Sequence, residues 1–284
     1  MVDSVMIGVR IEGTFHWGYW VRVPGTSKMQ PSLPLPTPTT LIGALSMPLV
    51  RSELIKCNGK EVGEFTIEAS ESGRVQDFKS SAAFLDRAVI GCAVALKTQA
   101  MYWEDINKYN TLFFQTLTKN TAEEKTAGGR RYLLKYLTGA ITAGKVIYPS
   151  GEAVLLFILD EEILEKILSS LWRRIIENAC WSITRVGSKE SIFSVNKVQI
   201  LKPKEVKGTV RTRFYFPAKA GKPKIGEKYY MESFWKGGWG RHDPPFFIDY
   251  IVPGGRSPIA SESIRVDVQG KAYEFGPEEV LLVS

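Results

Sequence analysis

The side chains that could carry chemistry in this 284-residue chain are few. Two histidines are present, His16 and His242, together with three widely separated cysteines, Cys57, Cys92 and Cys180. No pair of them has the spacing of zinc ligands, and the sequence contains no C-x-x-C, Walker A, G-x-S-x-G or dinucleotide-binding motif. The sequence therefore predicts neither a metal site nor an organic cofactor.

His16 is the residue for which a catalytic alternative stays open. A metal-independent ribonuclease needs a base to deprotonate a 2′-hydroxyl and a cation to hold the phosphate, and a histidine with a lysine provides both. The other interpretation is a histidine that stacks or forms a hydrogen bond at the edge of a loop. We expect His242 to be a turn residue and Cys180 to be a buried structural thiol.

The connection from Arg22 to Thr40 holds the first set of residues suited to binding phosphate. It carries Arg22 and Lys28 and leads into a helix, for which Thr39 is the expected N-cap. Unpaired backbone amides at the start of a helix attract anions, so Thr39 and Thr40 join the candidate site. The alternative is that this proline-rich connection simply packs on the surface of the fold.

The segment Arg185-Val-Gly-Ser-Lys-Glu190 is the second candidate. Its glycine, Gly187, lets a ligand approach the backbone closely, and Arg185, Ser188 and Lys189 can bond to phosphate or ribose. The alternative is a plain turn between a helix and a strand. Both loops could reach a common groove, and that coincidence favours a nucleic-acid site.

Hydrophobic periodicity predicts the elements that position these loops. The order is strand, helix, two strands, helix, strand, which is the order of a ferredoxin-like α+β domain. Asp160 is the expected N-cap of the second helix, and Pro48 is expected to kink or split the first. The predicted strands are 5–13, 62–68, 84–97, 153–159 and 191–201, and the predicted helices are 40–55 and 161–178.

The ferredoxin-like domain is expected to span residues 1–201, with an insertion at about 102–145 and a C-terminal extension at 202–284. Two short helical patterns, 104–118 and 130–138, are predicted within the insertion. The extension is expected to be rich in turns and short strands.

Charge is concentrated in the extension. The chain has a formal net charge of +7, and residues 202–241 contain eleven Lys or Arg but only three Asp or Glu. The same stretch holds eight aromatic residues, and cations mixed with aromatic rings suit single-stranded nucleic acid. The alternative is a solvated basic face above a few buried aromatic side chains. This region could bind RNA or a partner protein, and the sequence leaves both open.

Composition excludes several classes of protein. At 44% hydrophobic and 24% charged residues, the chain is globular, and it has no apolar run long enough to cross a membrane. The N-terminal residues lack the pattern of a signal peptide, and three scattered cysteines do not make a disulfide framework. A cytoplasmic protein without membrane contact is expected.

The two loops also carry a family resemblance. Pro34-Leu-Pro-Thr-Pro-Thr-Thr-Leu-Ile-Gly-Ala-Leu45 resembles the P-x-P-x-[ST]-T-L-x-G-x-L signature of CRISPR-associated RAMP proteins. Arg185-Val-Gly-Ser-Lys-Glu-Ser-Ile-Phe-Ser-Val195 is similar to the glycine-rich segment before the last core strand of the handle-binding subunit of type I Cascade. That subunit is the fifth numbered Cas family, and the archaeal type I-A variant fits best.

The resemblance implies a non-catalytic RNA-binding scaffold in antiviral defence. Such a subunit holds the 5′ handle of the CRISPR RNA and contacts the filament-forming backbone subunit and the large subunit, so it meets target DNA indirectly. The insertion would be the family's thumb. The residues that would border the RNA are Arg22, Lys28, Thr39, Thr40, Arg130, Arg131, Arg185, Gly187, Ser188 and Lys189.

Two other functions stay open. One is a metal-independent endoribonuclease that processes precursor CRISPR RNA through His16. The catalytic constellation of the type I-C relatives has no match in this sequence apart from that histidine. The other is an unrelated basic module that binds a protein.

Overall fold

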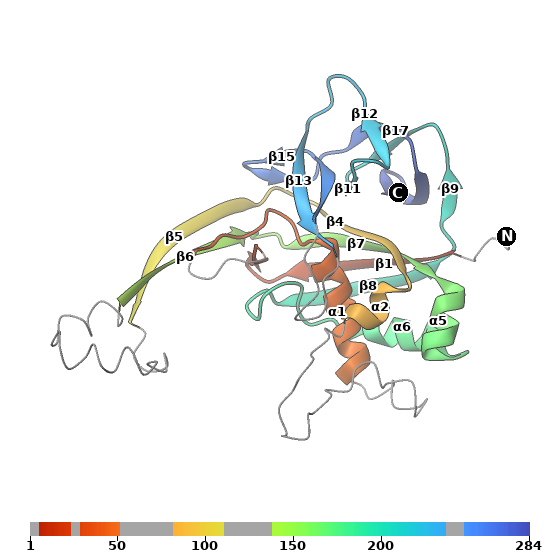
Figure 1. The fold of residues 1–284 in the computed structure, drawn as a ribbon, viewed down its shortest axis with the longest axis horizontal. Helices are drawn as coiled ribbons and strands as arrows, with labels where there is room; N and C mark the ends of the chain where they lie inside the picture. The colour runs from red at the N-terminus through yellow and green to blue at the C-terminus, as the bar shows by residue number, and fades with distance from the viewer. Residues whose placement is uncertain (1–5, 24–28, 52–81, 111–137, 237–246) are drawn as a thin grey trace, which may run out of the picture.

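The computed structural model describes residues 6–23, 29–51, 82–110, 138–236 and 247–284 (Figure 1). Its centre is a four-stranded sheet in which every neighbouring pair is antiparallel. The strands, in spatial order, are β4 (Val89–Leu96), β7 (Glu152–Asp160), β1 (Met6–Phe15) and β8 (Phe193–Leu201). The predicted strands 5–13, 153–159 and 191–201 are thereby confirmed, and 62–68 lies outside the described residues.

Burial explains why the two middle strands occupy the centre of the sheet. Seven consecutive residues of β7 are buried, from Ala153 to Leu159, as expected for a strand covered on both faces. In β1 the burial alternates, with Val9 and Ile11 fully buried. Both faces of the sheet are therefore covered by other parts of the chain.

Helices cover one face of this sheet, below it in Figure 1. They are α1 (Pro38–Arg51), α2 (Ala82–Asp86), α5 (Glu161–Leu168) and α6 (Trp172–Trp181). Leu41, Leu45 and Leu49 of α1 are fully buried at a spacing of four, so they form the face that packs inward. Pro48 lies inside α1, which continues past it to Arg51, so the predicted split does not occur there.

The predicted helix 161–178 is wrong in one respect, because it is two helices. Asp160 caps α5 as expected, its carboxylate accepting a hydrogen bond from the Ile163 amide at 3.1 Å. The chain then turns at Ser169, whose φ of 69° lies in the left-handed region. After this break, Leu171 is 63% exposed. Two successive serines, 169 and 170, are weak helix formers, and periodicity alone did not reveal the interruption.

The predicted strand 84–97 is also wrong at its start. Residues 82–86 form α2, and β4 begins at Val89. Ala82 and Leu85 are buried at helical spacing, and the Ala88 amide closes the last turn on the Leu85 carbonyl at 2.9 Å. Because most residues of the segment are apolar on both sides of Asp86 and Arg87, its hydrophobicity did not distinguish the helix from the strand that follows it.

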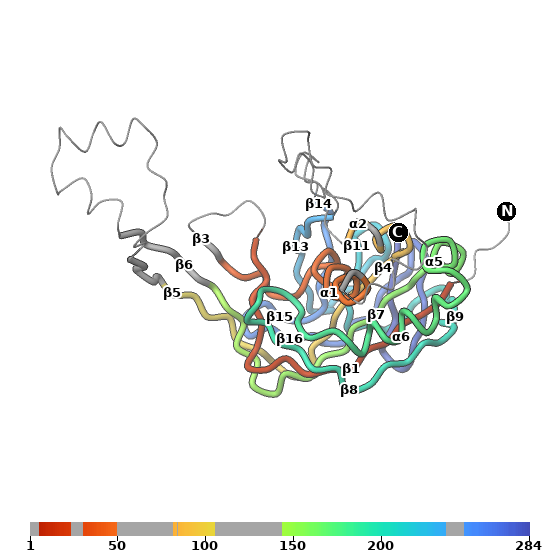
Figure 2. The backbone as a smooth tube through the Cα atoms, turned by 90° about the horizontal axis from the view of Figure 1, so that it is seen from below, coloured from red at the N-terminus to blue at the C-terminus, as the bar shows by residue number. Residues whose placement is uncertain are grey.

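The described residues of the insertion form two long paired strands. β5 (Met101–Asn110) pairs with β6 (Thr138–Ile147) through ten antiparallel residue pairs. Two short strands, β2 (Gly18–Tyr19) and β3 (Met29–Gln30), add to β6. The two arms project away from the body in both views (Figures 1 and 2). Strand structure at 104–110 and at Thr138 overturns the predicted helices there, and residues 111–137 lie outside the described residues.

The C-terminal extension consists of short strands on the face of the sheet opposite the helices (Figure 1). Phe214, Tyr215, Phe234 and Leu281 belong to the same hydrophobic core as β1, β7 and α1. The extension therefore shares a core with the sheet, and it has a second, smaller core of its own. Its strands are β9 (Lys204–Val206), β10 (Thr209–Thr212), β11 (Phe216–Pro217), β12 (Gly221–Pro223), β13 (Tyr229–Trp235), β14 (Phe247–Pro253), β15 (Gly255–Arg256), β16 (Ile259–Ala260), β17 (Ile264–Val268), β18 (Lys271–Gly276) and β19 (Glu279–Val283).

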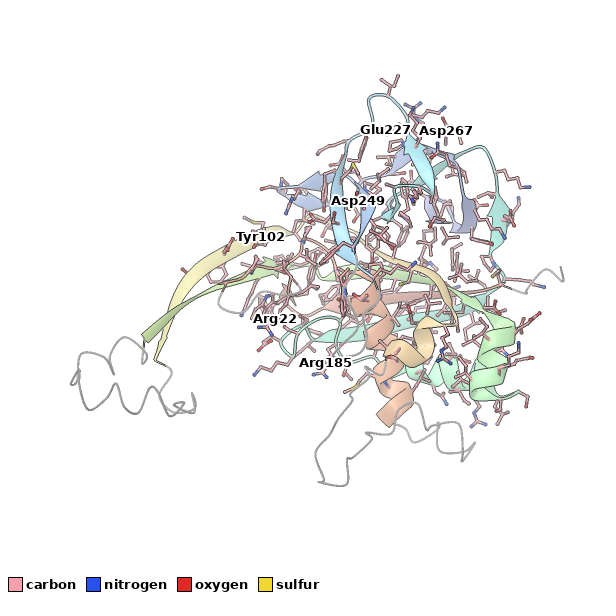
Figure 3. The ribbon with its side chains drawn as sticks, viewed as in Figure 1. Arg22, Tyr102, Arg185, Glu227, Asp249 and Asp267 are labelled. Atoms are coloured by element: carbon pink, nitrogen blue, oxygen red, sulfur yellow. The ribbon has the colours of Figure 1, made fainter. Side chains whose placement is uncertain are left out.

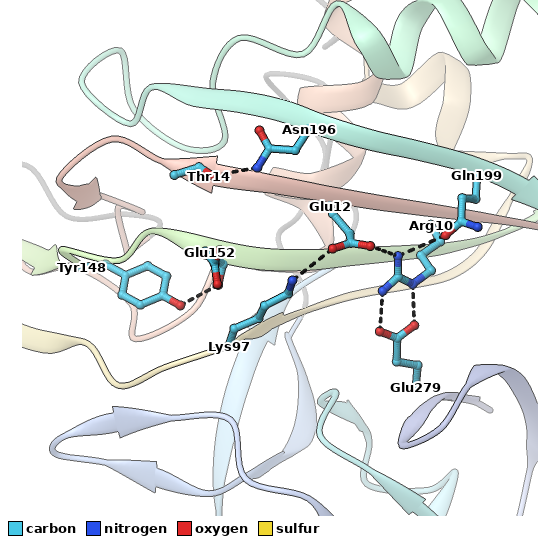
Figure 4. Close-up of polar contacts among 9 residues, drawn as sticks. All are labelled: Arg10, Glu12, Thr14, Lys97, Tyr148, Glu152, Asn196, Gln199 and Glu279. Atoms are coloured by element: carbon cyan, nitrogen blue, oxygen red, sulfur yellow. Dashed lines mark hydrogen bonds and ion pairs between the residues drawn. The ribbon is translucent and has the colours of Figure 1, made fainter.

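A network of ion pairs joins the sheet to the extension (Figure 4). The Arg10 guanidinium on β1 donates to both oxygens of Glu279 on β19, at 2.5 and 2.7 Å, and to Glu12 at 2.6 Å. Lys97 completes the network with a 3.0 Å bond to Glu12. Hydrogen bonds from Arg10 and Lys97 lower the pKa of Glu12 from 4.5 to about 2, so its carboxylate is charged at neutral pH.

Candidate nucleic-acid interface

The two loops singled out in the sequence are joined by hydrogen bonds at one residue, Trp20. Its carbonyl accepts from the Ser188 amide at 2.9 Å and from the Ser191 hydroxyl at 3.3 Å. Its own amide donates to the Ser191 hydroxyl oxygen at 2.8 Å. The loop after β1 and the loop before β8 therefore form one unit, here called the joined loops, comprising residues 16–22 and 184–194.

Gly187 makes the close approach of the joined loops possible. Its φ of +119° lies in the region that favours glycine. A β-carbon at this position would lie 2.8 Å from the Trp20 carbonyl oxygen and 2.9 Å from the Ser191 hydroxyl, both shorter than real contacts. The glycine is therefore required by the joining of the loops, which is a more specific role than the ligand approach expected from the sequence.

Three cations stand on the surface of the joined loops. Arg22 and Arg185 are exposed (Figure 3), and the Lys189 side chain is 83% exposed. The guanidinium carbon of Arg22 lies 5.8 Å from the centre of the Trp20 ring, a cation–π distance that holds the arginine over the indole. The structure thus places the loop that carries Arg22 against the loop that carries Arg185, Gly187, Ser188 and Lys189.

Glu190 is the acidic member of this surface. The Ser188 hydroxyl donates to its carboxylate at 2.8 Å, and the Lys189 ammonium lies 3.8 Å away. Burial raises the pKa of Glu190, but the bond from Ser188, its own backbone amide, Lys189 and Lys145 together lower it below 4.5. The carboxylate is therefore charged at neutral pH and competes with any bound anion for Ser188 and the lysines.

Thr39 and Thr40 have a different position from the one expected. The residue that caps α1 is Thr37, whose hydroxyl oxygen accepts from the Thr40 amide at 3.3 Å, and Pro38 takes the first helical position. Thr39 is buried and shares a 2.9 Å hydroxyl bond with Thr37. It lines a small cavity whose other walls include Cys92 and Tyr215 from β4 and the extension.

The prediction of Thr39 as the N-cap is therefore wrong, because proline at the first turn moves the cap back by two residues. The start of α1 is covered by the C-terminal extension and is not part of the joined loops. Lys28, Arg130, Arg131 and His242 lie outside the described residues, so their predicted roles stay predictions.

His16 is exposed, and its Nε2 atom shares a 2.7 Å hydrogen bond with the Ser194 hydroxyl. A hydroxyl partner neither charges the ring nor supplies a cation for phosphate, which a ribonuclease needs beside its base. Cys180 is buried as expected, and burial raises the pKa of its thiol and that of Cys92 well above the usual value. Within the described residues, no group of three His, Cys, Asp or Glu side chains could hold a metal ion.

Sequence reasoning missed Trp17, the most exposed tryptophan of the joined loops. Its side chain is 84% exposed, and its φ of 69° is unusual for a residue other than glycine. The neighbouring Gly18 pairs with Ile147 on β6, which pairs in turn with Met101 on β5, and Ile147 and Met101 are both exposed. The only signal in the sequence was the aromatic run His-Trp-Gly-Tyr-Trp at 16–20. An exposed aromatic ring on the same loop as Arg22 suits an unpaired base.

The aromatic residues and cations of residues 202–241 have an explanation other than nucleic-acid binding. Phe214, Tyr215, Phe216 and Phe234 are fully buried, so these rings serve the core. Many of its cations pair with acids elsewhere in the extension: Arg211 and Arg213 with Glu278, Lys224 with Asp267, Lys228 with Glu262, and Arg256 with Glu232. The alternative of buried aromatics beneath a charged face therefore describes these four rings and the paired cations, whereas Tyr229 is 43% exposed.

No helix in the described part of the chain has the length and hydrophobicity needed to span a bilayer. The described residues form a mixed α and β fold in which strands predominate.

Comparison with known proteins gives the family. No protein-family model matches the chain. Two proteins of Saccharolobus solfataricus, described as CRISPR system aCascade subunit Cas5 1 and CRISPR-associated protein Cas5 3, are each 32% identical over 281 residues, which is 97% of this chain and 99% of theirs. A third, CRISPR-associated protein Cas5 2, is 25% identical over 286 residues, covering 97% of this chain and 95% of its own.

A crystal structure of a CRISPR protein from Archaeoglobus fulgidus shares the fold, with a TM-score of 0.53 and 21% identity over 98% of this chain and 99% of that one. Two of these relatives are more than 30% identical to this chain over nearly their whole length, which indicates a shared family as well as a shared fold. All three relatives are described as Cas5 proteins. The chain belongs to the Cas5 family of CRISPR-associated proteins.

Proposed function

We propose that this protein is the subunit of an archaeal Cascade that holds the 5′ handle of the CRISPR RNA on its joined loops. The observation that carries the proposal is the pair of loops fastened at Trp20, which presents Arg22, Arg185 and Lys189 on one surface. Cations on a rigid backbone neutralise phosphates in a fixed geometry. The exposed Trp17, on the same loop as Arg22, offers a stacking surface for a base.

The topology supports assignment to the ferredoxin-like RAMP class. The sheet order β4-β7-β1-β8, antiparallel throughout, is the order expected when two strand–helix–strand units interleave. In this arrangement the connections after β1 and before β8 emerge at neighbouring strands, which explains why distant segments of sequence form one site. Guide sequence is read by base pairing, so the protein grips backbone and handle shape.

The proposed partners follow from the same assignment. The arms β5 and β6 project from the body and would serve as the thumb against the RNA and the backbone subunit. The large subunit would contact the RNA end of the complex and read target DNA. Membership of a multi-subunit complex is supported by the Cascade name of a relative that is similar over its whole length.

Replacing Glu190 with glutamine is expected to tighten handle RNA binding about fivefold, because one charge at a few ångströms in water is worth about 1 kcal/mol. The variant keeps the size of the side chain and releases Lys189 from a carboxylate. Fluorescence anisotropy with labelled handle RNA measures the change. Glu177→Gln, an equal charge change on α6, is the matched control. Unchanged or weaker binding by Glu190→Gln would place the RNA away from this loop.

We propose that the protein does not cleave RNA. Incubation with precursor CRISPR RNA in EDTA is expected to leave the RNA intact, because His16 has a hydroxyl as its partner and no cation is bonded to it in the described structure. Denaturing gel electrophoresis gives the result. A discrete cut that disappears in His16→Ala would establish the alternative, a metal-independent endoribonuclease that processes precursor CRISPR RNA.

A further inference from the structure

Among the exposed lysines of the C-terminal extension that have no ion pair in the described structure, four lie at one end of the extension. They are Lys207, Lys219, Lys222 and Lys271, here called the lysine cluster. No ion pair of theirs occurs among the described residues, whereas neighbours such as Lys224, Lys228 and Arg265 each have a carboxylate within 2.6–2.8 Å. The lysine cluster therefore differs from the paired cations that lie beside it in the same region.

Backbone hydrogen bonds gather these four lysines at one end of the extension. The amides of Gln269 and Gly270, just before Lys271, both donate to the carbonyl of Ala220, just after Lys219, at 2.9 and 3.0 Å. The amide of Val268 donates to the carbonyl of Gly208, just after Lys207, at 2.9 Å. Lys222 follows on β12, two residues after Ala220. The turn before β18 is therefore the centre of the cluster.

Two of the four lysines flank the end of one strand pair. In the β9–β18 pair, Lys204 lies opposite Glu274, a favourable arrangement, and Val206 lies opposite Ala272. Lys207 follows Val206 and Lys271 precedes Ala272, so both lysines lie at the same end of this pair. Like charges close to one another repel, and a bound anion would relieve that repulsion.

The acid opposite Lys222 does not balance the lysine cluster. Asp267 lies opposite Lys222 in the β12–β17 pair. Its carboxylate already accepts from the Lys224 ammonium at 2.6 Å and from the Thr209 hydroxyl at 2.6 Å, and these bonds lower its pKa. Lys222 and Lys224 together with Asp267 keep a net positive charge, which adds to that of Lys207, Lys219 and Lys271.

The cluster is separate from the joined loops. Asp267, which pairs with Lys222 of the cluster, lies in the extension at the top of the view, whereas Arg22 and Arg185 lie well below it beside the central sheet (Figure 3). A ligand held by one surface therefore leaves the other open.

We propose that the lysine cluster binds the phosphate backbone of a duplex nucleic acid, a second contact independent of the RNA handle. Four point charges on exposed, flexible stems neutralise phosphates without reading bases. No aromatic side chain of β9, β12, β17 or β18 is among the exposed ones, so this surface lacks the stacking rings that unpaired bases require. Both features fit a duplex, in which the bases are already stacked and the backbone faces outward.

The test compares two charge-matched double variants of the full chain. Lys207→Gln with Lys271→Gln removes two charges from the cluster, and Lys166→Gln with Lys197→Gln removes two exposed charges from α5 and β8. Binding of a short labelled duplex DNA is followed across salt concentrations. The cluster variant is expected to bind about tenfold more weakly near 0.1 M salt and to lose about two units of salt slope, while the control keeps the wild-type slope.

Three results would overturn the proposal. They are equal slopes for the two variants, no duplex binding by the wild-type protein, and polyglutamate competing for the cluster as well as duplex does, which would assign it to an acidic protein. Single-stranded handle RNA serves as the second probe. The cluster variant is expected to bind it normally, so a failure at the cluster and a failure of the handle site give different patterns. Unchanged thermal melting shows that the exposed substitutions leave the fold intact.

Discussion

Replacing Arg10 with methionine is expected to lower the free energy of unfolding by about 3–5 kcal/mol, the usual cost of stranding buried charges. The Arg10 side chain is only 13% exposed, and it holds Glu279 and Glu12, which are 16% and 24% exposed. Methionine fills the space but leaves both carboxylates without their main partner. Chemical denaturation at neutral pH measures the loss. Arg174→Met on the exposed face of α6 is the control and is expected to stay within about 0.5 kcal/mol of the wild type.

The same network predicts the pH dependence of stability. Folding lowers the pKa of Glu12 from 4.5 to about 2, so its contribution is complete above pH 4.5 and is lost as the pH falls from 4.5 towards 2. In Arg10→Met that contribution is largely gone already, and acid neutralises the stranded carboxylates. The stabilities of the two proteins are therefore expected to converge on acidification. Curves that stay parallel from pH 7 to pH 2 would contradict the role given to this network.

Replacing both Arg185 and Lys189 with alanine is expected to weaken handle RNA binding strongly and to flatten its salt dependence. Each lost phosphate contact removes about 0.7–0.9 units of slope, so two contacts remove between one and two units. Both side chains are exposed, so the melting temperature is expected to stay unchanged. Filter binding at several salt concentrations gives affinity and slope together.

The matched control for this double variant removes Lys166 and Arg174, two exposed cations on α5 and α6. It makes the same change in net charge far from the joined loops, so it corrects for general attraction between a basic protein and RNA. An affinity loss shared equally by the two variants, or an unchanged slope for the Arg185 and Lys189 variant, would remove the 185–190 loop from the site.

The strands and helices that build the central sheet could be predicted because each has its own periodicity. β1 alternates, β7 is uniformly apolar and bounded by Asp160, and α1 repeats leucine every fourth residue. The secondary-structure predictions were wrong where a helix and a strand have similar composition. The apolar stretch 84–97 hides the boundary between α2 and β4, and residues 104–110 carry a pattern compatible with a helix until their partner strand is known.

The site was partly predictable. Arg22 and the 185–189 segment were found from residue type and from the family signature, and the structure brings them together. Trp20 and Ser191, which join the two loops, were missed because their role depends on a contact between residues 171 positions apart. The same limit explains the tail, where Arg213 finds its carboxylate at Glu278, 65 positions along the chain. Local charge counts register an excess of cations but not the distant acids that pair with them.

The most direct test of the account is a titration of the wild-type protein with 5′-labelled CRISPR RNA whose handle is either intact or scrambled. Both RNAs have the same length and charge, so the phosphate attraction common to all RNA cancels in the comparison. The account predicts tight binding that depends on the intact handle. Equal affinity for the two RNAs would contradict handle recognition by the joined loops.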